Sequence, residues 1–263
     1  MIDIHCHILP GIDDGPASID ESLDMCRIAA ADGIRTIVAT PHFKPGTYQP
    51  SSNEVIEKGK QLQKAVKQEG IGISILLGAD VTVTPELPQY LASIEHITIN
   101  RTKRYFLAEF PHDSVPPKWD SFLLAIKRSG VTPILTHPER NPWFLSHREA
   151  LYPYVRAGGM VQITAMSITA PAGEPIRYFC DFLLRHDLVH VIASDAHARE
   201  GRAPRLADSV AAARAIVGKE KAAALVTTIP EAIIAGRDFM LAEPIMDFEV
   251  EEKKTWLRRL ASF

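Results

Sequence analysis

Short apolar runs alternate with helical patterns along the chain, and this alternation constrains the fold more than any other feature of the sequence. Seven runs rich in β-branched residues and leucine predict strands, at residues 2–4, 36–40, 71–77, 105–108, 132–136, 160–164 and 189–193. Helical patterns lie at residues 18–33, 51–70, 85–94, 119–129, 146–157, 174–186, 204–217, 219–226 and 230–235. Such alternation predicts parallel strands joined by helical crossovers.

Side chains that bind metal ions follow six of the seven predicted strands. They are His5, His7, Asp14, His42, Asp80, Glu109, His137, Asp195 and His197. His5 and His7 are two residues apart, so they point to the same side of an extended backbone. Each residue alone has an ordinary explanation, and Asp14, for example, fits a turn before Gly15. Six strand ends that carry such residues together are better explained by one shared site.

The positions of these residues favour a closed barrel over an open, doubly wound sheet. In a barrel of parallel strands, the carboxyl ends form one rim, where active sites lie. In an open sheet, the edge strands would lie too far apart to share a site. We therefore predict one α/β domain over residues 1–263, a seven-stranded barrel with a charged, helical tail from about residue 247.

Composition and charge argue against several other classes of protein. The net charge of −3 gives no reason to expect nucleic-acid or anionic-membrane binding. We expect no signal peptide, since Met1 leads into a predicted strand without a basic n-region or a long apolar h-region. We expect no membrane insertion, since no apolar run reaches about 18 residues. The three cysteines do not make a disulfide framework, which favours a reducing, cytoplasmic location. None of them is followed six residues later by the arginine that a cysteine-dependent phosphatase needs.

The donor atoms of the nine residues indicate the metal and the chemistry. Imidazole nitrogens and carboxylate oxygens together suit Mn, Fe or Zn. Nine ligands exceed the needs of one ion, and Glu109 and Asp195 are the best candidates to bridge two or three ions. A multinuclear site stabilises both the attacking and the leaving oxygen in phosphoryl transfer. Arg140 and Arg202 each follow a ligand closely in the chain, and a guanidinium group suits a phosphate dianion.

The ligand pattern resembles that of the polymerase-and-histidinol-phosphatase superfamily. The similar segments cover nearly the whole chain and are MIDIHCHILPGIDDGP, GIRTIVATPHF, GADVTVTPEL, LAEF, THPER and DLVHVIASDAH. Within the superfamily, the chain is most similar to the manganese-dependent protein-tyrosine phosphatases of bacterial capsular and exopolysaccharide loci. The resemblance implies a distorted seven-stranded barrel with three metal ions, usually manganese. It implies a metal-bound hydroxide that attacks phosphotyrosine, with Arg140 and Arg202 at the phosphate. The implied substrate is the tyrosine-rich tail of a membrane-associated autokinase that controls polysaccharide export.

Two departures from the family pattern leave alternatives open. The family usually has glutamate where this chain has Asp80, so a third ion is expected to bind differently or more weakly. The loop after His42 lacks the family's more basic stretch, which leaves the substrate open. A phosphatase for histidinol phosphate or another small molecule would use the same ligands. A nuclease or a non-catalytic binding protein fits the charge and the intact ligand set less well. The general acid and the oligomeric state stay open.

Overall fold

The computed structural model describes residues 1–246, so the predicted tail helix from about residue 247 lies outside the described residues. The strands are β1 (Ile2–Cys6), β2 (Thr36–Ala39), β3 (His42–Phe43), β4 (Ser74–Leu77), β5 (Asp80–Thr82), β6 (Tyr105–Glu109), β7 (Thr132–Thr136), β8 (Met160–Thr164) and β9 (Val191–Ala193). They form two parallel sheets, in the orders β1-β2-β4 and β3-β5-β6-β7-β8-β9.

The two sheets continue one another across two short breaks in the chain. β3 follows β2, and β5 follows β4, after two residues each. Across the break, the N–H of Gly78 donates to the carbonyl of Ala39 at 2.9 Å, and that of Asp80 donates to Pro41 at 3.1 Å. Seven of the strands in the described part correspond to the seven predicted runs, whereas β3 and β5 lie beyond the runs predicted at 36–40 and 71–77.

The first strand also meets the last. A parallel bridge pairs Cys6 with Ala196, just beyond β9. The N–H of Asp195 donates to the carbonyl of His5, and the N–H of His7 donates to that of Ala196, both at 2.8 Å. These contacts complete a ring of parallel strands, although neither sheet closes through a regular ladder. The predicted α/β architecture with parallel strands is confirmed.

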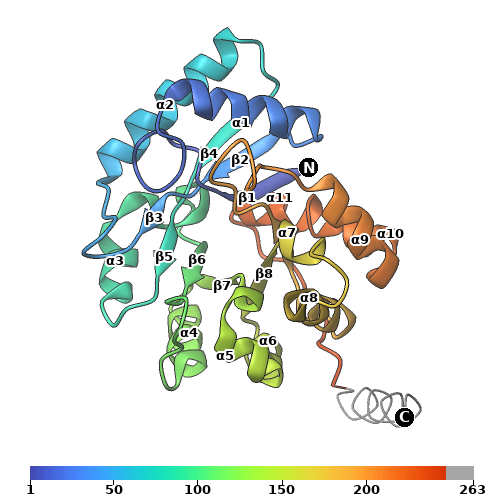
Figure 1. The fold of residues 1–263 in the computed structure, drawn as a ribbon. Coiled ribbons are helices and arrows are strands. Elements are labelled where there is room, and N and C mark those ends of the chain that lie inside the picture. Colours follow the sequence, from blue (N-terminus) through green and yellow to red (C-terminus); the bar gives the residue numbers. More distant parts are fainter. Residues whose placement is uncertain (247–263) are drawn as a thin grey trace.

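Helices surround the strands (Figure 1), and none in the described part of the chain is long and apolar enough to cross a membrane. The α-helices are α1 (Ile19–Ala31), α2 (Ser52–Gln68), α3 (Leu87–Ser93), α4 (Trp119–Arg128), α5 (Pro142–Ser146), α6 (Leu151–Arg156), α7 (Ala165–Ile168), α8 (Pro175–Arg185), α9 (Ala207–Val217), α10 (Lys219–Ala224) and α11 (Thr228–Ile234). Short 3₁₀ helices lie at η1 (Glu95–Ile97), η2 (Ile99–Arg101), η3 (Pro138–Arg140) and η4 (Arg148–Ala150). The hydroxyls of Ser18 and Ser51 cap α1 and α2, as the capping-box spacing predicts.

The prediction of one helix over residues 146–157 is wrong. α5 ends at Ser146, and the chain passes through η4 before α6 begins at Leu151. Pro153 explains the break, because it has no N–H and would disrupt a helix that had begun several residues earlier. In the structure it lies in the first turn of α6, where its N–H is not needed.

Side chains that alternate along each strand place the site above an apolar layer. On β6, Tyr105 and Leu107 pack in the smaller of two apolar clusters, and Glu109 follows them on the same face. On the last strand, Val191 and Ala193 pack in that cluster, and Asp195 comes two residues later. Apolar residues therefore fill the amino-terminal part of the ring, and polar residues occupy its carboxyl end.

Candidate metal centre

All nine predicted ligands meet at the carboxyl end of the strands. They fall into four groups, and inside each group the donor atoms lie within 4.8 Å of one another. The groups are His7, Asp14, His42 and His197; His5, His7 and Asp80; His5, His137 and Asp195; and His42, Asp80 and Glu109. Within residues 1–246, these groups contain every predicted ligand and no other residue. We call these nine residues the metal centre.

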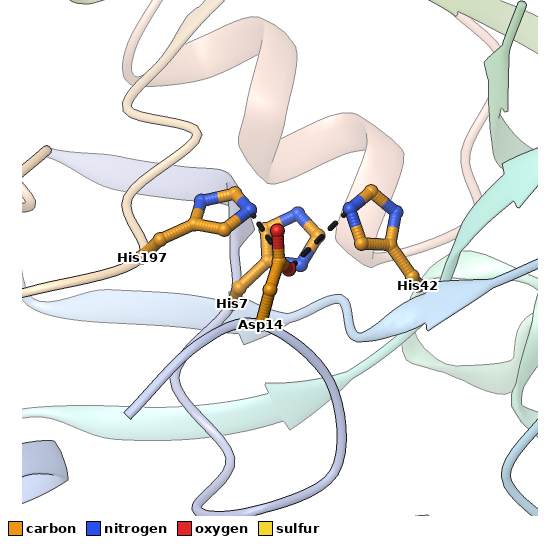
Figure 2. Close-up of side chains that lie close together, drawn as sticks. All are labelled: His7, Asp14, His42 and His197. Atoms are coloured by element: carbon orange, nitrogen blue, oxygen red, sulfur yellow. Dashed lines mark ion pairs between the residues drawn. The ribbon is translucent and has the colours of Figure 1, made fainter. Parts of the chain in front are cut away.

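The outermost group consists of three imidazoles that face one carboxylate (Figure 2). Asp14 Oδ1 lies 3.3 Å from Nε2 of His197 and 3.6 Å from Nε2 of His42. The rings of His7 and His197 stack with their centroids 3.8 Å apart. Asp14 is half exposed and comes from the loop after β1, whereas His7 is fully buried at the end of that strand. The group therefore lies at the mouth of the metal centre.

The inner groups share residues with one another. His5 Nε2 lies 3.6 Å from Asp80 and 3.5 Å from Asp195. His42 Nδ1 lies 3.4 Å from Asp80 and 3.6 Å from Glu109. Because His5, His42 and Asp80 each belong to two groups, the arrangement suits neighbouring ions that share ligands.

Buried polar atoms without partners show that the residues fit a metal site. Both carboxylate oxygens of Asp80 and Nδ1 of His42 are buried and have no hydrogen-bond partner. Such atoms are costly to bury unless something binds them. Imidazole and carboxylate donors are those that Mn, Fe and Zn accept, so a divalent ion would satisfy these atoms.

The hydrogen bonds behind the imidazoles turn Nε2 toward the centre. Nδ1 of His7 donates to Asp13 Oδ2 at 2.7 Å, and Nδ1 of His5 donates to Gln162 Oε1 at 2.9 Å. Nδ1 of His197 donates to the carbonyl of Asp195 at 3.0 Å. Each Nδ1 is therefore occupied, which leaves Nε2 free for a metal ion. Neither Asp13 nor Gln162 was predicted to belong to the site. The only feature of the sequence that could have pointed to either residue was the pair of adjacent carboxylates, Asp13 and Asp14.

Burial and neighbouring charges shift the pKa values of the site in opposite directions. Burial lowers the pKa of His137 to about 4 and raises that of Glu109 to about 8. Burial also opposes the charged form of His5, but the carboxylates of Asp80 and Asp195 outweigh it and raise the His5 pKa to about 9. Carboxylates packed this closely need compensating positive charge, which either protons or metal ions supply.

Backbone strain marks two of the strand ends. His137 has φ of 32° and Asp195 has φ of 51°, in the left-handed region that residues with a side chain rarely adopt. His137 directly follows β7, and Asp195 lies two residues beyond the end of β9. Strain of this kind persists where the surroundings over-determine it, and it gathers at functional sites.

Two arginines converge on the carboxylate of Asp195. Arg202 Nη2 donates to Asp195 Oδ2 at 2.8 Å, and Arg140 forms an ion pair with the same oxygen. Both side chains are about one-third exposed and line a cavity of about 110 Å³, together with Phe110 and His112. We call it the site cavity. It places the two predicted guanidinium groups beside the metal centre.

Four further histidines stand apart from the ligand groups. His112 is exposed between β6 and α4 and lines the site cavity without joining a ligand group. His147 follows α5, and His186 follows α8. His190 is buried just before β9, where its Nδ1 accepts from the N–H of Val161 at 3.0 Å. Their exclusion from the predicted ligand set therefore agrees with their positions.

Comparisons with known proteins place this geometry in a family. The model of the family described as capsular polysaccharide synthesis, CpsB/CapC, matches residues 1–235. The tyrosine-protein phosphatase YwqE of Bacillus subtilis is 39% identical over 197 residues, which cover 75% of this chain and 77% of YwqE. The tyrosine-protein phosphatase CpsB of Streptococcus pneumoniae is 30% identical over 239 residues, covering 89% and 98% of the two chains.

A solved structure shows the same fold. It comes from work on YwqE of Bacillus subtilis and CpsB of Streptococcus pneumoniae, which are described there as unique metal-dependent tyrosine phosphatases. The two structures superpose with a TM-score of 0.88 and 34% sequence identity, over 93% of this chain and 98% of the other.

Proposed function

This chain belongs to the CpsB/CapC family of capsular polysaccharide synthesis, and from that premise we propose that it is a metal-dependent protein-tyrosine phosphatase. The observation that carries the proposal is that nine side chains able to bind metal ions form overlapping groups, and that six of them line one cavity together with two arginines. The names of the relatives support phosphotyrosine as the substrate and give no support to histidinol phosphate, the alternative that the sequence left open.

The metal centre is the part of the proposal that would activate the attacking water and stabilise the charge on the phosphoryl oxygens. We propose three ions, manganese in the first place, held by the four overlapping groups, with Fe or Zn as the other metals that suit these donors. Divalent ions held there supply Lewis-acid stabilisation of the phosphoryl oxygens and a nucleophile near neutral pH. Glu109 and Asp195 remain our candidates to bridge ions. Asp80, which belongs to two groups, is a third.

The arginines bind and orient the phosphate. Arg140 and Arg202 both contact Asp195 from the wall of the site cavity, so their guanidinium groups are held where a phosphate dianion would enter. Because each carries several donors in a fixed plane, together they can hold two phosphate oxygens and stabilise the added charge of the transition state. Phe110 and Phe144 line the same cavity and provide an apolar wall for the tyrosine ring.

We further propose the kind of substrate that the protein acts on in the cell. The family is one of capsular polysaccharide synthesis, which supports a phosphotyrosine protein of that system, such as the tail of a bacterial tyrosine autokinase. We also propose a cytoplasmic location. The three cysteines are unpaired and buried, and this is consistent with a reducing compartment.

A rate comparison on metal-stripped protein tests the proposal. Mn, Zn, Fe(II) or Mg is added back, and a phosphotyrosine peptide is assayed beside histidinol phosphate. We expect Mn to restore activity, with a strong preference for the peptide. A preference for histidinol phosphate would keep the metal centre and overturn the protein substrate. Equal rates with and without metal would overturn the metal centre itself.

A further inference from the structure

An apolar groove lies beside the site cavity, at the carboxyl ends of β5 and β6. Its volume is about 460 Å³, and it is lined by residues 83–85, Phe110, residues 116–119, Ser121 and Phe122. Phe110, which directly follows the predicted ligand Glu109, lines both the groove and the site cavity. The two hollows therefore adjoin at one aromatic side chain. We refer to this hollow as the apolar groove.

The wall of the groove is held in place by aromatic packing. Trp119, the first residue of α4, lies edge-on to Phe110 with the ring centroids 5.7 Å apart, and edge-on to Phe144 at 5.2 Å. Trp119 and Phe110 are both buried, so their positions are set by the core beneath them. Pro116 and Pro117 also line the groove, and their rings restrict the backbone conformation there. A preformed apolar surface of this kind costs little ordering when it binds a ligand.

A second observation points to the same place. Lys118, between the two prolines and α4, has φ of 60° and ψ of 27°, which is the left-handed conformation. No side chain caps the helix there. A residue with a side chain rarely adopts this conformation, which is strained for lysine. The strained residue turns the chain into α4 at the edge of the groove, beside the site cavity.

We propose that the apolar groove binds an apolar side chain of the substrate peptide, within three residues of the phosphotyrosine. This inference rests on the proposed tyrosine-phosphatase function. A phosphotyrosine whose phosphate lies at Arg140 and Arg202 places its ring toward Phe110, since that side chain lines the same cavity. An extended peptide advances about 3.3–3.6 Å per residue, so three residues reach about 10 Å beyond the tyrosine. The groove thus selects for sequence around the phosphotyrosine, whereas the metal centre acts on the phosphate.

The first experiment tests the peptide. One phenylalanine is moved through each position within three residues of phosphotyrosine, in a peptide whose other residues are serine and glycine. We expect kcat/KM to rise about tenfold at one or two positions on one side of the tyrosine. Burial of one phenylalanine side chain contributes enough binding free energy for a change of about this size. The gain should appear in KM, because the groove does not contact the reacting atoms.

The second experiment tests the groove. Ser121 is exposed and lines the groove, so Ser121→Glu brings a carboxylate into it. We expect this variant to lose most of the preference for phenylalanine, because an apolar side chain would then be buried against a charge. Ala125→Glu is the matched control. Ala125 is exposed one turn further along α4 and outside the groove, and the preference should persist there. Thermal unfolding of both variants checks that they are folded.

The outcomes separate this inference from the proposed function. If the wild-type enzyme hydrolyses phosphotyrosine peptides but treats every position of the phenylalanine alike, the groove is not a substrate site and the phosphatase function stands. The same holds if Ser121→Glu and Ala125→Glu, both folded, keep an equal preference. If no phosphotyrosine peptide is hydrolysed with any of the metals, both the function and the inference are overturned.

Discussion

The metal centre and the apolar groove adjoin at Phe110, yet they are built in opposite ways. In the metal centre, imidazoles and carboxylates are buried together, and further hydrogen bonds, such as that from His7 to Asp13, orient the rings. In the groove, aromatic rings pack on one another, and Lys118 is the one charged residue among those that line it. Polar atoms fix the first region, and apolar packing fixes the second.

This difference assigns separate tasks to the two regions. In the proposed function, the metal centre and the arginines act on the phosphate group, which all phosphomonoesters share. The groove can act only on a substrate that extends beyond the tyrosine. Changes in the metal centre should therefore lower the hydrolysis of p-nitrophenyl phosphate and of a phosphotyrosine peptide by the same factor, whereas changes in the groove should act on the peptide alone. The predictions that follow test this separation, from the largest effect to the smallest.

The largest effect is expected from the loss of a ligand. We expect His7→Ala and Asp195→Ala each to abolish turnover of both substrates while the fold survives, because the two apolar clusters do not depend on these side chains. Rates in metal-replete buffer and thermal unfolding provide the measurement. His147→Ala, at an exposed histidine after α5, is the control. Unchanged turnover in either ligand variant would remove that residue from the metal centre.

A smaller loss is expected from the arginines. Arg140→Ala and Arg202→Ala should each cost roughly 2–4 kcal/mol of transition-state stabilisation, since each removes a charged donor at the phosphate. The loss should appear in kcat for both substrates. Arg199→Ala is a matched control. Arg199 lies three residues before Arg202 in the chain, is exposed, and pairs with Asp24. Wild-type rates from both variants would remove the arginines from the mechanism.

The sequence predicted much of the fold because the hydrophobic pattern reports directly which segments are buried. All seven apolar runs became strands of the ring, and the ligands at their ends met. The short strands β3 and β5 were not predicted, since the apolar runs end before them. The prediction of a single helix over residues 146–157 was wrong because it gave the apolar pattern more weight than Pro153. That residues 1–263 form a single domain stays a prediction.

The candidate site was predictable only in part, for a different physical reason. The candidate ligands could be predicted because each follows one of the apolar runs in the sequence, and in the structure these residues converge. The roles of the individual ligands stay predictions. The two residues behind them, Gln162 and Asp13, were missed for different reasons. Gln162, within β8, bonds to His5 across 157 residues, and nothing local marks it. Asp13 and Asp14 are adjacent carboxylates, and a turn pattern cannot tell which one faces the ligands.

The pH dependence of metal affinity distinguishes the two regions further. Burial opposes the charged form of His5 and of His42, but neighbouring carboxylates, Asp80 above all, raise both pKa values to about 9. Without metal these imidazoles hold a proton at neutral pH, and a metal ion must displace it. The apparent affinity for Mn should therefore rise as the pH rises from about 7 to 9, by up to about tenfold per pH unit for each proton displaced.

A titration of the metal-free protein with Mn, in competition with a chelator of known affinity, measures this dependence. The peptide preference assigned to the apolar groove should stay constant over the same range at saturating metal, because Lys118 is the one titratable residue that lines it. A flat Mn affinity would show that these imidazoles are neutral before the metal binds. A preference that changed with the affinity would show that the two regions are coupled.

The smallest effect is expected at Asp13, which tests whether the hydrogen bonds behind the ligands matter. Its Oδ2 accepts from Nδ1 of His7 at 2.7 Å and from the N–H of His42 at 3.0 Å, so one carboxylate holds two ligands. Asp13→Asn keeps the shape but removes the charge and one acceptor. We expect Mn affinity to fall about tenfold, with kcat nearly restored at saturating metal, because the ligands themselves remain.

Asp20→Asn, at an exposed aspartate in the first turn of α1, is the control, and its Mn affinity should match that of the wild type. If Asp13→Asn also matched the wild type, the stacking of His7 on His197 at 3.8 Å would be sufficient to orient the ligand. The metal centre would then be held by ring packing, as the apolar groove is. The two regions would differ only in the ligands that they bind. A loss of kcat that excess Mn does not restore would instead place Asp13 in the reaction rather than behind it.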